Sequence, residues 1–146
     1  MLAKFHKRGW VAALVLTGAI VAGCQSMSPM MAEQQITLSG TNEVPPVTTT
    51  ASGTATVSIK DDRSVSVKVT VTGMTATASH IHEGAAGANG PVIVPFTKTG
   101  DNTFAAADGA KLTEAQYASY KAGNLYVNVH SAKNPGGEVR AQLKAN

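Results

Sequence analysis

The chain has 146 residues, which is room for one domain of ordinary size. Hydrophobic residues make up 43% of it and charged residues 14%, and this composition excludes an intrinsically disordered chain. The formal net charge of +3 raises the question of nucleic-acid binding. Three of the 12 basic residues, however, precede residue 24, so the rest of the chain carries nine basic and nine acidic side chains. This balance excludes binding to nucleic acid driven by net charge.

The N-terminus has the pattern of an export signal. Lys4, Lys7 and Arg8 precede an apolar run over residues 10–22, which is too short for a comfortable membrane span. Small residues then lead into Cys24, the single cysteine of the chain. The segment resembles a bacterial lipoprotein signal, in which the cysteine is lipidated and becomes the new N-terminus; an ordinary secretory signal with an incidental cysteine is the alternative. We expect a signal peptide over 1–23, a flexible tether over 24–34 and a folded β-barrel domain over 35–146.

This reading predicts where the protein is located. We expect it to be exported and anchored by lipid on Cys24 in the bacterial cell envelope. Gln25 follows the cysteine where inner-membrane lipoproteins carry aspartate, so we expect the outer membrane, with the domain facing the periplasm. The expected partners are the membrane, through the lipid, and an envelope protein, but no nucleic acid. Because a lipidated Cys24 leaves no thiol for a disulfide, stability must come from core burial, strand pairing or a metal.

Short alternating runs follow from residue 35 onward. The sequence predicts strands at 36–38, 54–59 and 65–72, and the last two form a hairpin across a polar turn at 60–63. Between the first two strands, residues 43–47 contain two successive prolines and cannot occupy the middle of a sheet. Further strands are expected at 78–82, 92–96 and 103–106, with Pro95 at a sheet edge or a bulge.

The C-terminal third contains the one predicted helix. Thr113 and Gln116 have the spacing of a capping box, Gly123 ends the helix, and Tyr117 and Tyr120 share the face that packs on the sheet. Strands at 125–130 and 138–143 follow, joined by a turn at 134–137. Seven to nine short strands and one short helix predict an all-β fold, a Greek-key sandwich or barrel.

Three histidines carry the candidate chemistry: His80, His82 and His130. Because His80 and His82 are two residues apart in a strand, their side chains leave the same face, with Cβ atoms roughly 6.5–7 Å apart. Two imidazoles at that spacing can converge on one ion. His130 shares its strand face with Tyr126 and Asn128. If the two strands are neighbours, three imidazoles meet.

A site of three imidazoles with one open position suits copper or zinc. Tyr126, Asn128, Glu83 and Glu138 are candidates to hydrogen-bond the imidazoles and fix their tautomers, and Arg140 is a candidate to attract an anion. The alternative is that His80 and His82 face solvent while His130 bonds the loop backbone near 134. No phosphate loop or catalytic triad competes with this site, because the glycine-rich segment 84–90 lacks a lysine and nothing places a serine against a base.

Four motifs together resemble a known family. They occupy residues 38–47, 79–92, 123–130 and 134–140, and in this order they resemble the CHRD domain, which is named from repeats in chordin and is common in exported bacterial proteins. The resemblance covers residues 35–143 and departs at Ala141, where the family usually has glycine. It implies an immunoglobulin-like or Greek-key β-barrel, and the family's pairing of His-X-His with a later Val-His favours a metal site. Residues 80–84 are also similar to the copper-binding strand of copper-zinc superoxide dismutases, although the bridging histidine, zinc ligands and disulfide of that family have no counterparts here.

Three hypotheses follow. The first is an envelope-anchored CHRD lipoprotein that binds a metal ion, preferably copper, through His80, His82 and His130 and holds or transfers it. The second is a binding or structural module without metal that contacts an envelope protein or a glycan. The third is a dismutase-like copper redox enzyme in which Arg140 steers the anion. Binding ranks above catalysis because the sequence offers ligands but no dedicated machinery for protons or substrates.

Overall fold

The alternating hydrophobic residues of the predicted hairpin form two fully paired strands, β2 (Ser52–Ile59) and β3 (Val65–Thr72). The computed structural model describes residues 33–145 of the chain. The valines of β3 are buried and the intervening lysine, serine and threonines are exposed, as the period of two requires. Arg63, with a φ of 70°, supplies the left-handed residue of the connecting turn.

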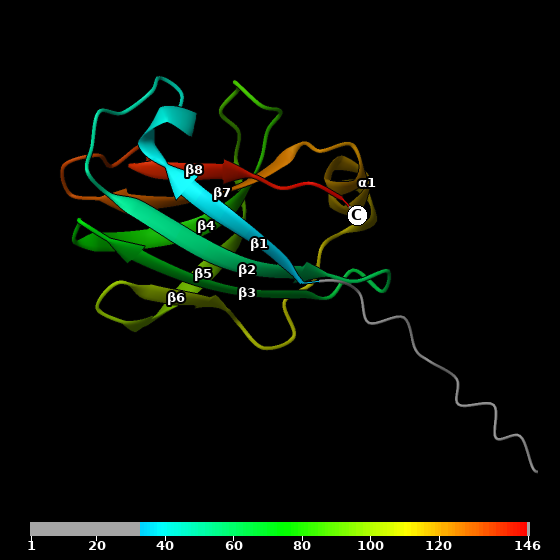
Figure 1. Ribbon diagram of the computed structural model, residues 1–146. Helices are drawn as coiled ribbons and strands as arrows, with labels where there is room; N and C mark the ends of the chain where they lie inside the picture. Colours follow the sequence, from blue (N-terminus) through cyan, green and yellow to red (C-terminus); the bar gives the residue numbers. More distant parts are fainter. Residues whose placement is uncertain (1–32, 146) are drawn as a thin grey trace, which may run out of the picture.

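Eight antiparallel strands close into a barrel in the order β1-β2-β3-β6-β5-β4-β7-β8 (Figure 1). The remaining elements are β1 (Gln34–Ser39), the 3-10 turn η1 (Gly40–Asn42), β4 (Ala76–Glu83), β5 (Val92–Gly100), β6 (Thr103–Ala106), α1 (Glu114–Lys121), β7 (Leu125–Ser131) and β8 (Val139–Gln142). β1 and β8 close the barrel by pairing Ser39 with Arg140. Strand β7 returns to lie beside β4 after the β4-β5-β6 meander, which is Greek-key wiring. The predicted all-β Greek-key barrel with one short helix is confirmed.

Valine is the most frequent residue in the interior of the barrel. Burial of these β-branched side chains on the inner faces of paired strands supplies most of the stability. Larger side chains fill the remaining space, and all of them are at most 2% exposed: Leu38, Ile81, Phe104, Leu125 and Leu143.

The helix α1 lies at one end of the barrel (Figure 1). Its N-terminus has the predicted capping box: the Thr113 hydroxyl accepts from the Gln116 amide, and the Gln116 side chain accepts from the Thr113 amide. Tyr120 is buried and its hydroxyl donates to the Lys144 carbonyl, while the Tyr117 hydroxyl donates to Asp61 at 2.9 Å. Both tyrosines therefore fasten the helix to the barrel, as predicted.

Pro95 was predicted at a sheet edge or a bulge, and it lies close to an irregularity in the β4–β5 ladder. Strand β5 pairs with β4 over Val92 to Pro95 and with β6 from Phe96 onward. The proline is thus the residue at which β5 passes from one neighbour to the other. The register shift on β4, between Ile81 and His82, lies close by. A proline is accepted where the ladder is irregular because fewer of its hydrogen bonds depend on a backbone N–H.

The predicted signal peptide, Cys24 and the tether up to residue 32 lie outside the described residues. Strand β1 begins at Gln34, one residue before the expected start of the domain. The Lys144 amide donates to the Gln34 side chain at 3.1 Å, so both ends of the described chain lie at the same end of the barrel. Within residues 33–145, no helix has the length and apolar character needed to cross a membrane.

Candidate metal centre

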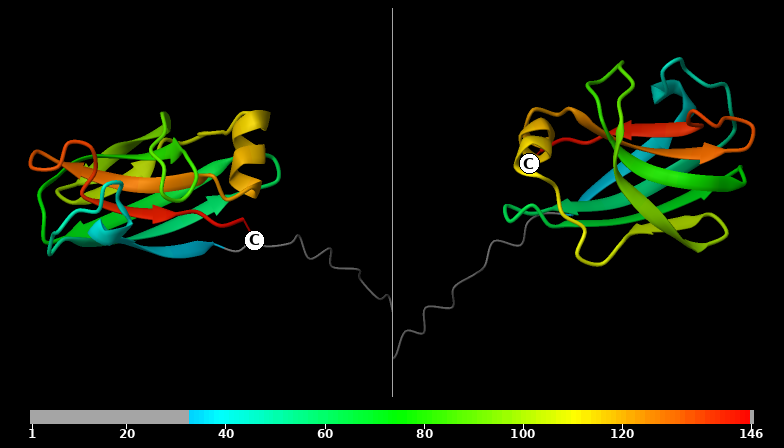
Figure 2. Two further views of the ribbon diagram at one scale, coloured as in Figure 1. Left: turned by 90° about the horizontal axis from the view of Figure 1, so that it is seen from above. Right: turned by 180° about the vertical axis from the view of Figure 1, so that it is seen from behind.

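The outer face of β7 is as deeply buried as its inner face. All seven residues of β7 are buried, although alternate side chains point out of the barrel. Connecting segments cover this outer face: Asn89, in the loop after β4, donates to the Val44 carbonyl, and Thr49 donates to Glu138 at 2.6 Å. The loops that follow β4 and η1 rise on the same side of the barrel (Figure 2). The polar residues of this outer face therefore lie in a layer between strand and loop.

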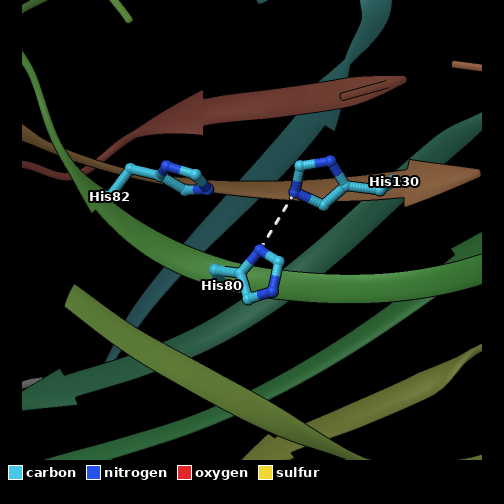
Figure 3. Close-up of side chains that lie close together, drawn as sticks. All are labelled: His80, His82 and His130. Atoms are coloured by element: carbon cyan, nitrogen blue, oxygen red, sulfur yellow. Dashed lines mark hydrogen bonds between the residues drawn. The ribbon is translucent and has the colours of Figure 1, made fainter. Parts of the chain in front are cut away.

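Strand pairing places the three histidines together. In the β4–β7 ladder His82 lies opposite Tyr126, and His130 lies opposite Ala78, two residues before His80. The ring centroids of His80 lie 5.4 Å from His82 and 4.8 Å from His130, and His82 lies 5.9 Å from His130. One nitrogen from each ring lies within 4.8 Å of the others (Figure 3). We call this group the histidine trio.

Two backbone carbonyls fix the tautomers of His82 and His130. The Nδ1 atom of His82 lies 2.9 Å from the Gly90 carbonyl, and the Nδ1 atom of His130 lies 2.9 Å from the Pro135 carbonyl. A carbonyl oxygen only accepts hydrogen bonds, so each Nδ1 carries the proton and each Nε2 keeps a lone pair. The Nε2 atom of His82 is buried without a hydrogen-bond partner in the structure. A backbone carbonyl on the distal nitrogen is the usual support for a metal-binding imidazole.

His80 completes the trio from the solvent side. Its Nδ1 atom lies 3.0 Å from the Nε2 atom of His130, and because that Nε2 atom accepts, His80 donates. If this proton moves from Nδ1 to Nε2 of His80, the Nδ1 atom is left with a lone pair that faces inward. The trio then offers three inward lone pairs. Two imidazole nitrogens on one tetrahedral ion are about 3.3 Å apart, given metal–nitrogen bonds of about 2.0–2.1 Å. The spacing of 3.0 Å between His80 and His130 is close to that value, and the nitrogen of His82 lies within 4.8 Å of both.

Burial keeps all three imidazoles neutral. Loss of solvent, together with charge repulsion from the neighbouring His130 and His82, lowers the pKa of His80 to about 4. Burial also lowers the pKa of His82 and of His130, even though the carbonyls of Gly90 and Pro135 oppose this effect. Neutral imidazole is the form that binds a metal. The trio is therefore ready to bind an ion at neutral pH without losing protons.

An aromatic and a cation stack behind His82. The Tyr126 ring lies parallel to the His82 ring, with an interplanar angle of 8° and centroids 4.9 Å apart. The guanidinium carbon of Arg140 lies 3.3 Å from the Tyr126 centroid. Arg140 is 1% exposed, and it donates to the carbonyls of Ala85 and Ala88 and to the Asn89 side chain. Arg140 thus fastens the loop over the site, and its guanidinium does not face solvent, where an anion would approach.

The other predicted neighbours divide into two groups. Asn128 lies beside His82, and its polar side chain raises the pKa of that histidine, but its Oδ1 atom and the Nε2 atom of His82 do not meet hydrogen-bond geometry. Glu83 instead accepts from the Ser119 hydroxyl, and Glu138 accepts from Thr49 and Ser131. Glu138 bonds the segment that brings the Pro135 carbonyl to His130, but neither carboxylate bonds an imidazole in the structure.

Glu43 is a residue of this layer that the sequence analysis did not single out. It is 5% exposed, its Oε1 atom has no hydrogen-bond partner in the structure, and burial raises its pKa to about 7 despite the charge of Arg140. Gly137 leaves room for it: with a φ of +132°, a Cβ at that position would lie 2.5 Å from Glu43 Oε1 and 2.7 Å from Asn128 Nδ2. The one sequence signal for Glu43 is an acid next to an apolar Val-Pro-Pro run.

A family model for the CHRD domain matches residues 34–143, which is most of the chain. The chain belongs to the CHRD family. The matched range contains the whole barrel, the histidine trio, Glu43 and Arg140, so the site belongs to the CHRD domain itself. Comparison with curated proteins and with solved structures returns no match.

Proposed function

We propose that this CHRD domain binds one copper ion through His80, His82 and His130 and holds or transfers it. The observation that carries the proposal is the Nε2 atom of His82, which is buried, has no hydrogen-bond partner and faces the other two imidazoles (Figure 3). An unpaired buried polar atom is costly, and a metal ion is a partner that satisfies all three nitrogens at once.

The chemistry of the three donors favours copper. All are neutral imidazoles, and the group contains no thiolate or carboxylate. Among divalent first-row ions, nitrogen sites bind copper most tightly, with zinc and nickel below it. Zinc is the alternative ion, since it also accepts three imidazoles and an open fourth position. The test below therefore titrates both ions.

The residues around the trio suit a protein that holds copper better than they suit a dismutase-like enzyme. In a dismutase-like enzyme a cation would face the open position of the metal and attract the anionic substrate. Arg140 is the cation nearest to that role, and its donors are used by the loop over residues 84–91. We therefore propose a binding protein and not a redox enzyme.

We also propose that the protein is exported and anchored through lipid on Cys24, with the domain in the periplasm at the outer membrane. The sequence pattern of residues 1–25 supports this. The trio lies at the level of Ser39, five residues along β1 from Gln34, which is roughly 17 Å in a strand. A domain on the predicted flexible, membrane-attached tether could present the trio to an envelope protein that exchanges copper. Cys24→Ser should release the protein from the membrane fraction and abolish labelling by a fatty-acid probe.

The test is a titration of the untagged protein with Cu(I), Cu(II) and Zn(II), each against a chromogenic chelator. We expect saturation at one equivalent, with copper tighter than zinc and a rise in melting temperature on binding. His82→Ala should lower the affinity at least 100-fold. Glu83→Gln is the matched control, since Glu83 is the next residue but bonds Ser119, and it should bind like wild type. Equal affinity of wild type and His82→Ala would contradict the metal site and favour a binding or structural module without metal.

A further inference from the structure

We infer that the site favours copper in its monovalent state and that the buried charge of Arg140 causes this preference. The inference rests on the proposed copper binding and names the oxidation state that the same site holds. Its basis is the stack of three side chains formed by His82, Tyr126 and Arg140, which we call the cation stack.

The positive charge of Arg140 is held close to the trio and is poorly screened. Its guanidinium is 1% exposed, and its hydrogen-bond partners are neutral: the carbonyls of Ala85 and Ala88 and the side chains of Asn89 and Gln142. Glu43 is the acid whose charge acts on it, and burial raises the pKa of Glu43 to about 7. The charge of Arg140 is therefore uncompensated below neutral pH and partly offset by Glu43 above it, in a site shielded from water.

Tyr126 fixes the distance between this charge and the metal ligands. Its ring contacts Arg140 on one side and His82 on the other, and its hydroxyl accepts from the Gly90 amide at 3.2 Å. The same Gly90 offers its carbonyl to His82, so one loop residue holds both the tyrosine and the ligand in place. An ion bound to the trio would lie roughly 10 Å from the guanidinium, as the two stacking distances indicate.

A cation at that distance penalises Cu(II) more than Cu(I). The trio contributes three neutral ligands, so nothing in the ligand set offsets the second charge of Cu(II). At an effective dielectric constant near 20, a unit charge roughly 10 Å away changes the binding of one further unit charge by about tenfold. Three neutral imidazoles also suit Cu(I), because this ion accepts a low coordination number and carries a single charge that needs no anionic ligand.

The experiment measures the affinity of the untagged protein for each oxidation state at pH 8. Cu(I) is titrated anaerobically against bicinchoninate, and Cu(II) against glycine. We expect wild type to bind Cu(I) at least tenfold more tightly than Cu(II). In Arg140→Gln the ratio of the two affinities should fall about tenfold, equivalent to a drop of about 59 mV in the reduction potential of the bound ion.

Three further variants separate charge from structure. Arg140→Lys keeps the charge but loses the forked donors, so the affinity ratio should stay close to wild type. Glu43→Gln removes the opposing charge, so the ratio should rise. This variant decides the question if Arg140→Gln does not fold. Lys68→Gln removes an exposed charge on β3 and should leave the ratio unchanged.

The outcomes separate this inference from the copper site itself. A ratio that does not move in Arg140→Gln and Glu43→Gln, while both variants still bind one copper, would overturn the role of the cation stack and leave the copper site intact. Absence of saturable binding in either oxidation state would overturn both proposals. A wild-type protein that binds Cu(II) more tightly than Cu(I) would contradict the inference alone.

Discussion

The Nδ1 atom of His80 lies 3.0 Å from the Nε2 atom of His130, although 50 residues separate the two in the chain. The contact exists because the Greek-key return places β7 beside β4, and it holds the trio closed when no ion is bound. This hydrogen bond can give way to a metal ion. When the proton of His80 moves from Nδ1 to Nε2, the Nδ1 atom of His80 and the Nε2 atom of His130 both present lone pairs to the centre of the trio. Metal binding at this site would require little rearrangement of the backbone.

The loop over residues 84–91 should depend on Gly90. A Cβ at this position would lie 1.6 Å from the Glu83 carbonyl oxygen, so the backbone must move in Gly90→Ala. We expect this variant to lose about 3 kcal/mol or more of unfolding free energy and to bind metal more weakly, because the Gly90 carbonyl orients His82. Chemical denaturation and a copper titration measure the two effects.

Gly87→Ala in the same loop is the control. Gly87 has a φ of +81° but no atom within 4 Å of its would-be Cβ, so the cost is limited to about 1 kcal/mol of backbone strain. Metal affinity should not change. Equal losses of stability and affinity in Gly87→Ala and Gly90→Ala would contradict the role given to the Gly90 carbonyl.

The metal-free protein should lose stability in acid through His80. Burial lowers the pKa of His80 from 6.5 in the unfolded chain to about 4 in the fold. Between these values the unfolded chain binds the proton and the folded protein does not, so stability falls as the pH drops from 6.5 to 4. His80→Gln should flatten this part of the curve, as measured by urea unfolding at several pH values. An unchanged slope in His80→Gln would refute the buried neutral state of this histidine.

Glu43 should affect the pH dependence of stability in the direction opposite to His80. Burial raises its pKa from 4.5 to about 7, so stability falls as the pH rises through this interval, because the folded protein must then ionise a buried acid. Relative to wild type, Glu43→Gln should therefore gain stability between pH 5 and pH 8, by about 3 kcal/mol at most. Glu33→Gln, at an exposed position, controls for loss of an acid. A difference between Glu43→Gln and wild type that stays constant with pH would contradict the burial of this carboxyl.

Local patterns in the sequence were sufficient to predict the elements of the barrel. The β2–β3 hairpin follows from valines at every second position, and the start and end of α1 follow from Thr113, Gln116 and Gly123. The hairpin and the helix ends depend on neighbours within a few residues of the chain. They can therefore be predicted from the sequence without knowledge of the fold. For Pro95 the sequence left a sheet edge and a bulge open, because its local sequence does not reveal that β5 changes partner there.

The site was predictable in part. The two-residue spacing of His80 and His82 placed their rings on one face, but the approach of His130 depended on the pairing of β4 with β7. The burial of the outer face of β7 also depends on long-range packing, because loops distant in sequence cover it. The same long-range packing brings Glu43 to Asn128 and turns Arg140 toward the loop after β4, and no local pattern of residues encodes these contacts.

The copper content of His130→Ala tests the convergence of the trio most directly. His80 and His82 lie on one strand, so His130 is the ligand that only the fold supplies. Untagged wild type and His130→Ala are loaded with one equivalent of copper, dialysed against a weak chelator and analysed for metal. We expect close to one copper per chain in wild type and almost none in His130→Ala. Full retention of copper by His130→Ala would contradict a site shared between β4 and β7.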